Sequence, residues 1–491
     1  MSGLGGQRRV LVLLVLLAVL RGGYWAVASP TPSPVDEIQH VDYARSLARL
    51  EGIPTVGRDR VADEILELAK ASPTYFLRSD PYPADFDDPR WRGAAVAQSY
   101  EGIQGPTYYL LIAPSYWLGR PWGMTGSFYA LRIGSVVLGA LALPLAWLLT
   151  RRLLPRRPGA WLVPPALLAG LNALNAGSAL VSNDIVVLTG AGAAAVLLLR
   201  ALERRTALAA AGAGATAAMV IVGKTTALPI IPLLALLGLP HLVRWWREDA
   251  AGAIRWTAVY AVAFGVPLAG WLAWNVWSYR AISAATVVES ITGSLQPTFT
   301  PSLRTFGLDW ESVRTGFSAA GGMAQPSRYG RLWEIVACGV IGTALLLAMR
   351  SRRGRDLETA GPMAWGLLAY PLTFLTVTLT FFVTLERSGL VIGRYLWVAV
   401  VPLAVALGVA LHKIAGRYVV VLVLACLVPI AWAERDMTFD TLRREYERDL
   451  VGNDLAPVVD QSWNDEIGRP DTLLIDVGCV GGAQIDRYAN I

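Results

Sequence analysis

Long apolar runs recur along most of this chain, and they constrain its fold more than any other feature. The 491 residues are 54% hydrophobic and 16% charged, whereas a soluble globular protein carries about 25% charged residues. A helix that crosses a bilayer needs about 20 mostly apolar residues. Such runs lie at 10–28, 127–149, 160–181, 184–202, 206–223, 225–243, 254–276, 333–350, 362–383, 392–411 and 417–433. The sequence therefore predicts an all-α polytopic membrane protein with about eleven transmembrane helices.

Arginine clusters between these runs predict the orientation of the chain. With the N-terminus in the cytoplasm, every basic connection falls on the cytoplasmic side, as the positive-inside rule requires; these connections are 151–159, 200–205, 241–249, 350–356 and 412–417. The same clustering argues against nucleic-acid binding, although the net charge is +6. The richness in Ala, Gly and Arg suggests a bacterial protein, and hence a multi-pass protein of a bacterial plasma membrane.

Two segments near the N-terminus need a separate interpretation. The stretch "YYLLIAPSYWLG", 108–119, is too short to cross the bilayer and contains Pro114, so it is predicted to be a re-entrant or interfacial helix. The first apolar run also fits a cleaved signal peptide, because Arg8-Arg9, an apolar core and "AVAS" match that template. With either interpretation, residues 29–126 face outside.

These boundaries predict one transmembrane domain, 1–433, followed by an extracytoplasmic tail, 434–491. The domain contains a long first extracytoplasmic loop, 29–126, with juxtamembrane helices, and a second large one, 277–332.

Polar residues gather at the outer face under this topology. Charges at membrane depth are costly and usually line the bundle interior or a cavity, so the group predicts an outward-facing site. Its members are Asp36, Glu37, His40, Glu101, Arg132, Asn183, Asp184, Lys224 and Arg394. Structural alternatives stay open for eight of these nine residues. Asp36, Glu37 and Asp184 could be helix caps, the basic residues could be anchors at the lipid boundary, Glu101 could be a solvated loop charge, and His40 could be a core residue.

Several of these stretches resemble a known family. "VDEIQHVDYARSLARLEGIPT", 35–55, resembles the first-loop signature of the GT-C superfamily of integral membrane glycosyltransferases, which includes protein O-mannosyltransferases and lipid A aminoarabinose transferases. "YEGIQGPTYYLLIAP", 100–114, is similar to a later "Y-E-x-H-Q-P-P-L-Y-Y" stretch of bacterial members, and "SND", "GKTT…P" and "GRYLWVAVVP" are similar to further landmarks. The resemblance spans about residues 10–412 in the order of its landmarks. Ile103 stands where His is common and Gly105 replaces the first Pro, which weakens the case for a metal or a second acid there.

The resemblance implies a GT-C-like bundle and an enzyme, a hexosyl- or pentosyltransferase. Such an enzyme moves a sugar from a polyprenyl-phosphate-linked donor to a hydroxyl of a lipid, polysaccharide or protein outside the membrane. It places the catalytic carboxylate at Asp36, which is the predicted general base, with Glu37 or Glu101 orienting the acceptor. One carboxylate and direct attack predict inversion at the anomeric carbon.

The leaving phosphate needs cations rather than a general acid. Lys224, Arg394 and Arg132 are therefore the predicted phosphate ligands. The predicted substrate-binding residues are His40, Tyr100, Gln104, Asn183, Asp184 and Tyr395. No metal-binding residues are predicted, and a divalent cation, Mg²⁺ or Mn²⁺, is left open as a cofactor.

A transporter or flippase of lipid-linked glycans is the alternative function. It would be expected to place ionisable residues near the bilayer midplane, often on broken helices in repeated halves. The mid-span positions here are almost free of charge, and the sequence shows no internal repeat. These observations favour the transferase.

Overall fold

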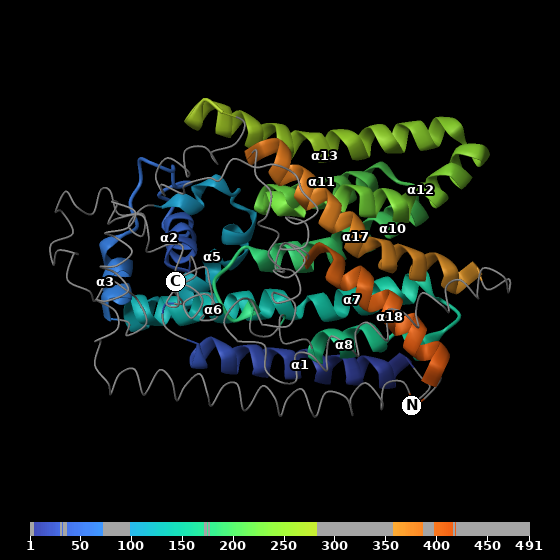
Figure 1. The fold of residues 1–491 in the computed structure, drawn as a ribbon, viewed down its shortest axis with the longest axis horizontal. Helices are drawn as coiled ribbons and strands as arrows, with labels where there is room; N and C mark the ends of the chain where they lie inside the picture. Colours follow the sequence, from blue (N-terminus) through green and yellow to red (C-terminus); the bar gives the residue numbers. More distant parts are fainter. Residues whose placement is uncertain are drawn as a thin grey trace, which may run out of the picture.

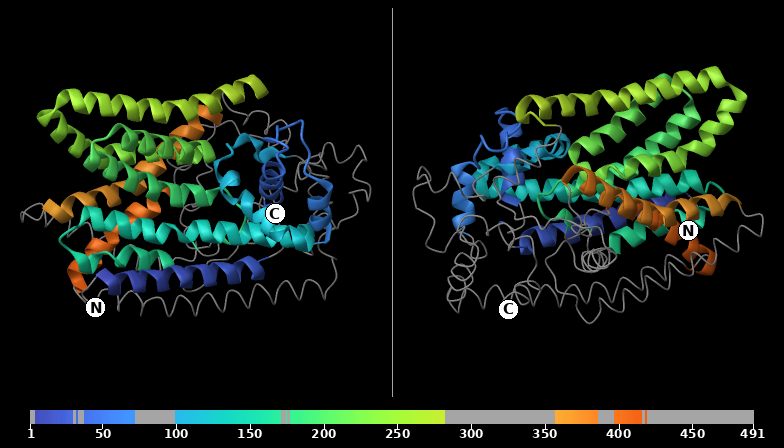
Figure 2. Two further views of the ribbon diagram at one scale, coloured as in Figure 1. Left: turned by 180° about the vertical axis from the view of Figure 1, so that it is seen from behind. Right: turned by 45° about the horizontal axis from the view of Figure 1, so that its top comes forward.

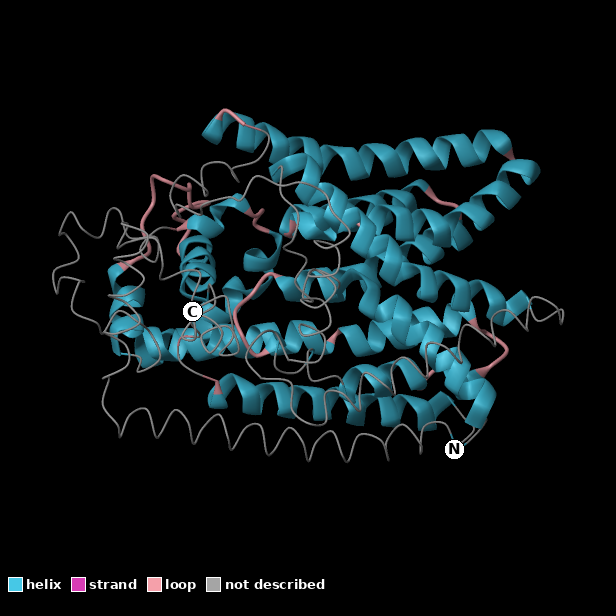
Figure 3. Cartoon of the chain, viewed as in Figure 1, coloured by secondary structure: helices cyan, strands magenta, loops and turns pink. Residues whose placement is uncertain are grey.

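The structure is a computed structural model, which describes residues 4–29, 32, 37–71, 99–170, 174, 177–281, 357–385, 397–415 and 418. Every regular element in these ranges is a helix, as the cartoon coloured by secondary structure shows (Figure 3). The predicted all-α fold is therefore confirmed for this part of the chain.

The helices differ widely in length, from single 3-10 turns to thirty residues. The α-helices are α1 (Leu4–Ala28), α2 (Glu37–Ala48), α3 (Asp63–Ala71), α5 (Thr107–Gly119), α6 (Gly123–Ala140), α7 (Ala142–Leu153), α8 (Val163–Gly170), α10 (Asp184–Arg204), α11 (Ala207–Gly223), α12 (Ile230–Glu248), α13 (Ala250–Tyr279), α17 (Leu357–Leu385) and α18 (Val400–Ala415). The 3-10 helices are η3 (Tyr100–Ile103), η4 (Arg120–Trp122), η5 (Pro158–Ala160) and η6 (Thr225–Ala227).

Many of these helices are apolar enough to lie in a membrane. Five stretches meet both the length and the composition of a span, namely Leu4–Val27, Thr107–Leu153, Asp184–Arg204, Thr225–Glu248 and Ala250–Tyr279. The helices Ala207–Gly223 and Trp397–Lys413 are apolar but shorter. The predicted spans 333–350 and 417–433, the loop 277–332 from residue 282 onward and the tail 434–491 lie outside the described residues. The described helices are those of a multi-pass membrane protein.

The long helices lie side by side, with α1 along one edge and α13 along the other (Figure 1). The short helices α2, α3 and α5 gather at one end of this bundle, and the two further views agree (Figure 2). The N-terminus lies at the opposite end. Helix α2, which carries the predicted site residues Glu37 and His40, therefore lies at the end of the bundle opposite to the N-terminus.

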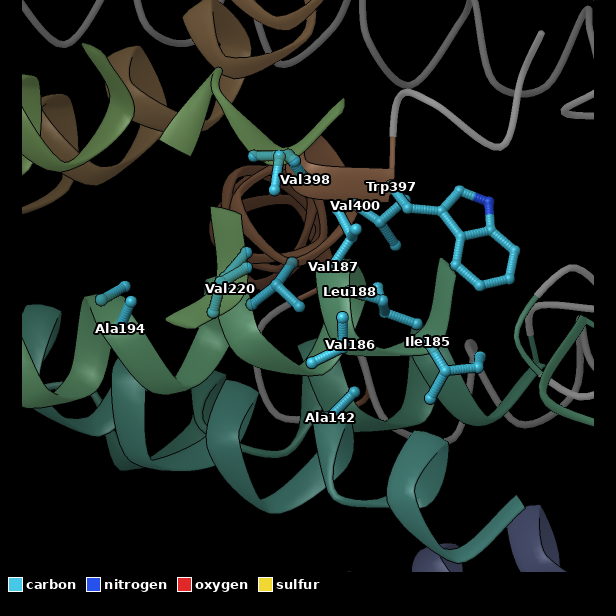
Figure 4. Packing of buried hydrophobic residues seen from close by; sticks show 14 of the residues in the cluster. Ala142, Ile185, Val186, Val187, Leu188, Ala194, Val220, Trp397, Val398 and Val400 are labelled. Atoms are coloured by element: carbon cyan, nitrogen blue, oxygen red, sulfur yellow. The ribbon is translucent and has the colours of Figure 1, made fainter. Parts of the chain in front are cut away.

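Helix α10 lies at the centre of the described bundle. In its apolar window 83% of the residues are buried, against 11% for α13, so α13 presents most of its surface outward. The buried side chains of α10 pack between α7, α11 and α18, as Figure 4 shows for Val187, Val220 and Val400. The fit against α11 is close, because a Cβ on Gly190 would lie 2.4 Å from Cγ2 of Val220. Small residues of this kind allow membrane helices to approach each other.

Helix α5 folds back along α6 instead of continuing in line with it. The turn between them includes Gly123, whose φ is +73°, a conformation that favours glycine. The two helices touch along their length: a Cβ on Gly119 would lie 2.2 Å from the carbonyl oxygen of Gly126, and one on Gly134 would lie 2.4 Å from Oγ of Ser115. This hairpin brings the first turn of α5 beside the middle of α6, where Arg132 and Ser135 lie.

Candidate active site

The predicted site residues that the structure describes lie where α2, η3 and α5 meet the start of α10 and the end of α11. A buried ion pair holds the first part of this region together. Arg132 of α6 and Glu37 of α2 are both fully buried, and Nε and Nη2 of Arg132 donate to the two oxygens of Glu37 across 2.8 and 2.7 Å. Nη1 of Arg132 also donates to the carbonyls of Ala26 and Ser29, at 2.7 and 3.1 Å. The backbone N–H of Val181 donates to Oε1 of Glu37 across 3.0 Å. The pair thus ties the end of α1, the start of α2 and the chain before α10 to α6.

A second cluster joins His40 of α2, Tyr109 of α5 and Glu101 of η3. The Oη of Tyr109 lies 2.7 Å from Nδ1 of His40 and donates to Oε2 of Glu101 across 3.2 Å. Because that donation uses the only hydroxyl hydrogen of Tyr109, Nδ1 of His40 is the donor to Tyr109 in this arrangement. All three side chains are buried, and Nδ1 of His40 lies 3.5 Å from Oε2 of Glu101. The three residues form a directed chain of hydrogen bonds that ends on the Glu101 carboxylate.

The next residues pack around this chain. Tyr43 lies flat against Tyr109, with ring centroids 3.8 Å apart, and its hydroxyl donates to the carbonyl of Gln104 across 3.0 Å. The side-chain Oε1 of Gln104 is buried and has no hydrogen-bond partner among the described residues. Tyr100 is buried on the same 3-10 turn as Glu101. Gln104 therefore presents an acceptor beside Glu101 that a ligand can use.

Asp42 is a buried carboxylate that the sequence interpretation missed. Its Oδ1 accepts from the backbone N–H of Ala62 at 3.1 Å, and its Oδ2 accepts from Oγ of Ser99 at 2.9 Å. Burial raises the pKa of Asp42 from 3.8 to about 6, although these hydrogen bonds and the nearby Arg45 lower it in part. The sequence shows a third carboxylate in "DEIQHVDY", but it does not show the two hydrogen-bond donors, which lie far from it in the chain. From the sequence alone, Asp42 could therefore not be distinguished from a solvent-exposed carboxylate.

The third cluster surrounds Lys224, which directly follows α11. Its Nζ donates to Oδ1 of Asn183 and lies 2.7 Å from Oδ1 of Asp184, both at the start of α10. Lys224 and Asp184 are nearly buried, and Asn183 is fully buried. The Nδ2 of Asn183 has no hydrogen-bond partner in the described part of the chain. The cluster therefore combines a buried cation with an amide donor that has no acceptor among the described residues.

Helix α5 contributes a further polar group at the same place. The ends of the elements approach closely, because the N–H of Gly105 donates to the carbonyl of Val222 across 2.9 Å and a Cβ on Gly223 would lie 3.2 Å from Cβ of Thr107. The Oγ1 of Thr107 is buried and, within the described ranges, unpaired. The contact explains why glycine stands at 105: proline has no N–H to donate, and a Cβ there would lie 2.4 Å from the carbonyl oxygen of Val222.

Tyr108 links the clusters. Its hydroxyl lies 2.5 Å from Oγ of Ser135 on α6 and accepts from the N–H of Ser182 across 2.9 Å. Tyr108 is fully buried, and its neighbour Tyr109 belongs to the His40 cluster. One helical turn of α5 therefore touches all three groups of polar residues.

Three predicted site residues, Asp36, Arg394 and Tyr395, lie outside the described residues. Within the described ranges, no group of three His, Cys, Asp or Glu residues lies close enough together to hold a metal ion.

No protein-family model matches the chain, and a search of curated proteins finds no match. Among solved structures, the chain is similar to ArnT from Cupriavidus metallidurans bound to undecaprenyl phosphate, with 14% identity and a TM-score of 0.48 over 97% of this chain and 76% of that one. It is similar to the arabinosyltransferase EmbB from Mycobacterium smegmatis, with 16% identity and a TM-score of 0.41 over 81% and 30%. It is also similar to the apo oligosaccharyltransferase of Archaeoglobus fulgidus, with 13% identity and a TM-score of 0.44 over 89% and 56%. The chain thus spans less than two thirds of the length of the last two proteins.

Proposed function

We propose that this chain is a membrane glycosyltransferase of the GT-C type, which transfers a sugar from a polyprenyl-phosphate-linked donor to a hydroxyl acceptor outside the membrane. The observation that carries the proposal is the Lys224 cluster. Asn183 and Thr107 each have a buried polar atom that has no partner among the described residues, and both residues lie next to the buried cation of Lys224. An ammonium group with adjacent amide and hydroxyl donors suits a phosphate, which in this proposal competes with Asp184 for Nζ of Lys224.

The donor's phosphate is both the recognition element and the leaving group in this proposal. A lipid phosphate leaves as an anion, so cations that stabilise developing charge replace a general acid. We assign this role to Lys224 together with Arg394. Arg132 has three nitrogens engaged by Glu37, Ala26 and Ser29, so its predicted phosphate role has less support than a structural one.

Asp36 is the proposed general base. Its carboxylate takes the proton of the acceptor hydroxyl while the acceptor oxygen attacks the anomeric carbon. The bond from that carbon to the phosphate oxygen breaks, and polyprenyl phosphate leaves with the electron pair. A single displacement of this kind inverts the anomeric centre.

Glu101 is the carboxylate that we propose to orient the acceptor. The sequence left Glu37 and Glu101 open for this role, and Glu37 already accepts from Arg132 and from the N–H of Val181. Glu101 accepts from Tyr109 and lies on the same turn as the unpaired Oε1 of Gln104. The acceptor is a hydroxyl of a lipid, polysaccharide or protein, and the site faces outward from a bacterial plasma membrane.

The test uses purified full-length protein in lipid nanodiscs. The donor pool is the lipid extract of a strain that lacks this protein, and mass spectrometry follows both the lipid-linked sugar and the released polyprenyl phosphate. Asp36→Asn should lower turnover by about 10²–10⁴ while donor binding persists. Lys224→Ala should weaken donor binding by about tenfold or more, whereas Lys413→Ala, at the other end of the bundle, should not.

Two results would overturn the proposal. If no lipid-linked sugar accumulates in that strain and none is consumed by the protein, the chain is not a transferase of this class. If the lipid-linked sugar crosses the bilayer with its phosphate bond intact, the chain is a transporter or flippase.

A further inference from the structure

A hollow of about 270 Å³ lies where α10 ends and α11 begins. Its wall consists of Leu197, Arg200, Ala201 and Arg204 of α10, the cap Thr206, and Leu208, Ala209 and Gly212 of α11. The Lys224 cluster lies at the other ends of the same two helices. Since α10 has 21 residues and rises about 1.5 Å per residue, the hollow is roughly one hydrocarbon thickness away from the candidate active site.

Two of the residues on the wall of this hollow are arginines. Arg200 and Arg204 are exposed and make no ion pair or hydrogen bond with any described residue. Adjacent arginines are paired: Arg152 with Glu203, and Arg205 with Glu248 at 2.7 Å. Like charges four residues apart on a helix repel each other, so an anion between Arg200 and Arg204 would stabilise this end of α10.

Apart from Thr206, the remainder of the wall is apolar. Leu208 is 84% exposed, and Leu197 lines the same hollow one turn before Arg200. Thr206 accepts from the N–H of Ala209 at 3.3 Å through its side-chain oxygen, which leaves its hydroxyl hydrogen for a ligand. Guanidinium groups beside exposed leucines match a ligand with an anionic head and an alkyl chain.

We propose that this hollow binds an anionic phospholipid, with its phosphate on Arg200 and Arg204 and an acyl chain along Leu197 and Leu208. Arginine binds phosphate in a bidentate manner. Under the predicted topology this end of α10 lies at the cytoplasmic leaflet, whose lipids include anionic ones and where basic pockets between helices bind their head groups. The proposal does not depend on the reaction at the opposite face.

The experiment measures the binding of labelled phosphatidylglycerol, and the unfolding midpoint that it shifts, for the full-length protein in detergent. Arg200→Gln with Arg204→Gln should weaken binding by about tenfold or more. The matched control is Arg244→Gln with Arg247→Gln on α12, which removes the same charge from exposed positions that do not line the hollow. Leu208→Ser should weaken lipid binding with no change of charge.

Three outcomes would overturn this site. Equal losses in the two double variants would mean that only the general positive charge of this end attracts the lipid. Equal binding of phosphatidylcholine and phosphatidylglycerol would exclude selection of an anionic head group. If inorganic phosphate alone raises the unfolding midpoint as much as the lipid does and Leu208→Ser has no effect, the ligand is free phosphate and the lipid assignment fails.

Discussion

At the scale of single residues, the polar groups of the candidate site separate into two kinds. Glu37 and Arg132 satisfy each other and nearby backbone groups, so their geometry is that of a structural clamp. Gln104, Thr107 and Asn183 each keep a buried atom that finds no partner in the described part of the chain. Polar atoms of the second kind need an explanation in a native protein, such as a catalytic role or a bound water or ion, and our proposal assigns these three to substrate binding.

The clamp predicts a large loss of stability when one member is removed. Arg132→Met leaves the Glu37 charge buried and unpaired, which should lower the free energy of unfolding by about 3–5 kcal/mol. Combining Arg132→Met with Glu37→Leu should restore part of that loss, because no buried charge remains. Thermal unfolding in detergent measures both. Arg152→Met, which breaks an exposed pair with Glu203, is the control and should cost about 0–1 kcal/mol. A stable Arg132→Met variant would contradict the structural role.

The hydrogen-bond chain makes Tyr109 a positioning residue for Glu101. Tyr109→Phe keeps the ring stack on Tyr43 but removes a hydrogen bond to a carboxylate, so turnover should fall by about tenfold or more. Because Glu101 is proposed to orient the acceptor, the KM for the acceptor should rise while donor binding is unchanged. Tyr43→Phe removes a hydroxyl from the same stack and should leave the KM for the acceptor in place. Equal changes in the two variants would contradict the assignment.

Asp42 predicts a dependence of stability on pH. Its folded pKa of about 6 lies above the ordinary 3.8, so the folded state binds the proton more tightly than the unfolded state does. Stability should therefore fall as pH rises from about 4 to 6, by on the order of 3 kcal/mol from this group. Asp42→Asn should flatten that part of the profile of unfolding midpoints, whereas Asp63→Asn, at an exposed carboxylate, should not. A parent profile that does not fall in this window would exclude the effect.

At the scale of elements, glycines set how closely the helices approach at the site. The N-terminal end of α5 reaches the end of α11 through Gly105 and Gly223, two residues that leave no room for a side chain. Lys224 follows directly after this contact. The packing of these two helix ends therefore controls where the ammonium group lies.

Gly105→Ala tests this packing. Its Cβ would lie 2.4 Å from both the carbonyl oxygen and Cγ1 of Val222, so the end of α11 must move, at a typical cost of about 1–3 kcal/mol for overpacking. We expect a lower unfolding midpoint and weaker donor binding, because Lys224 moves with α11. Gly265→Ala, on α13 where a Cβ meets nothing within 4 Å, should be neutral or stabilising. Unchanged donor binding in Gly105→Ala would show that this packing contact does not position the donor site.

At the scale of the whole molecule, the described helices place two polar regions at opposite ends of α10 and α11. The unpaired donors lie at one end and the arginine-lined hollow at the other. The predicted topology assigns these ends to opposite sides of the membrane. Both proposals therefore depend on the same orientation.

Single-cysteine labelling tests that orientation after Cys338, Cys426 and Cys479 are replaced. An impermeant thiol reagent should reach Arg58→Cys from outside intact cells, and Pro155→Cys only after the cells are opened. Both positions are exposed in the structure, so accessibility is decided by the membrane rather than by the fold. Labelling of Pro155→Cys alone in intact cells would reverse the topology and place the candidate active site in the cytoplasm.

The helical class and the membrane location followed from the sequence alone. The energetics of insertion depend on local composition, because about 20 consecutive apolar residues bury themselves in lipid whatever their partners are. The stretch at 108–119 was likewise recognised as a short helix from its length and Pro114. The polar residues near the ends of the spans could also be recognised from the sequence, because the boundary of an apolar run is a local feature.

Only the tertiary structure decided which of those polar residues contact one another. Glu37 meets Arg132 across 95 residues, His40 meets Tyr109 across 69, and Lys224 meets Asn183 across 41. These contacts depend on how α5 folds back on α6 and on glycine contacts between helices, which fix distances to a few tenths of an ångström. A hydrogen bond requires that accuracy, and a single sequence carries no measure of distances between residues far apart in the chain. The apolar runs therefore determined where the helices lie, and the packing between them determined the chemistry at their ends.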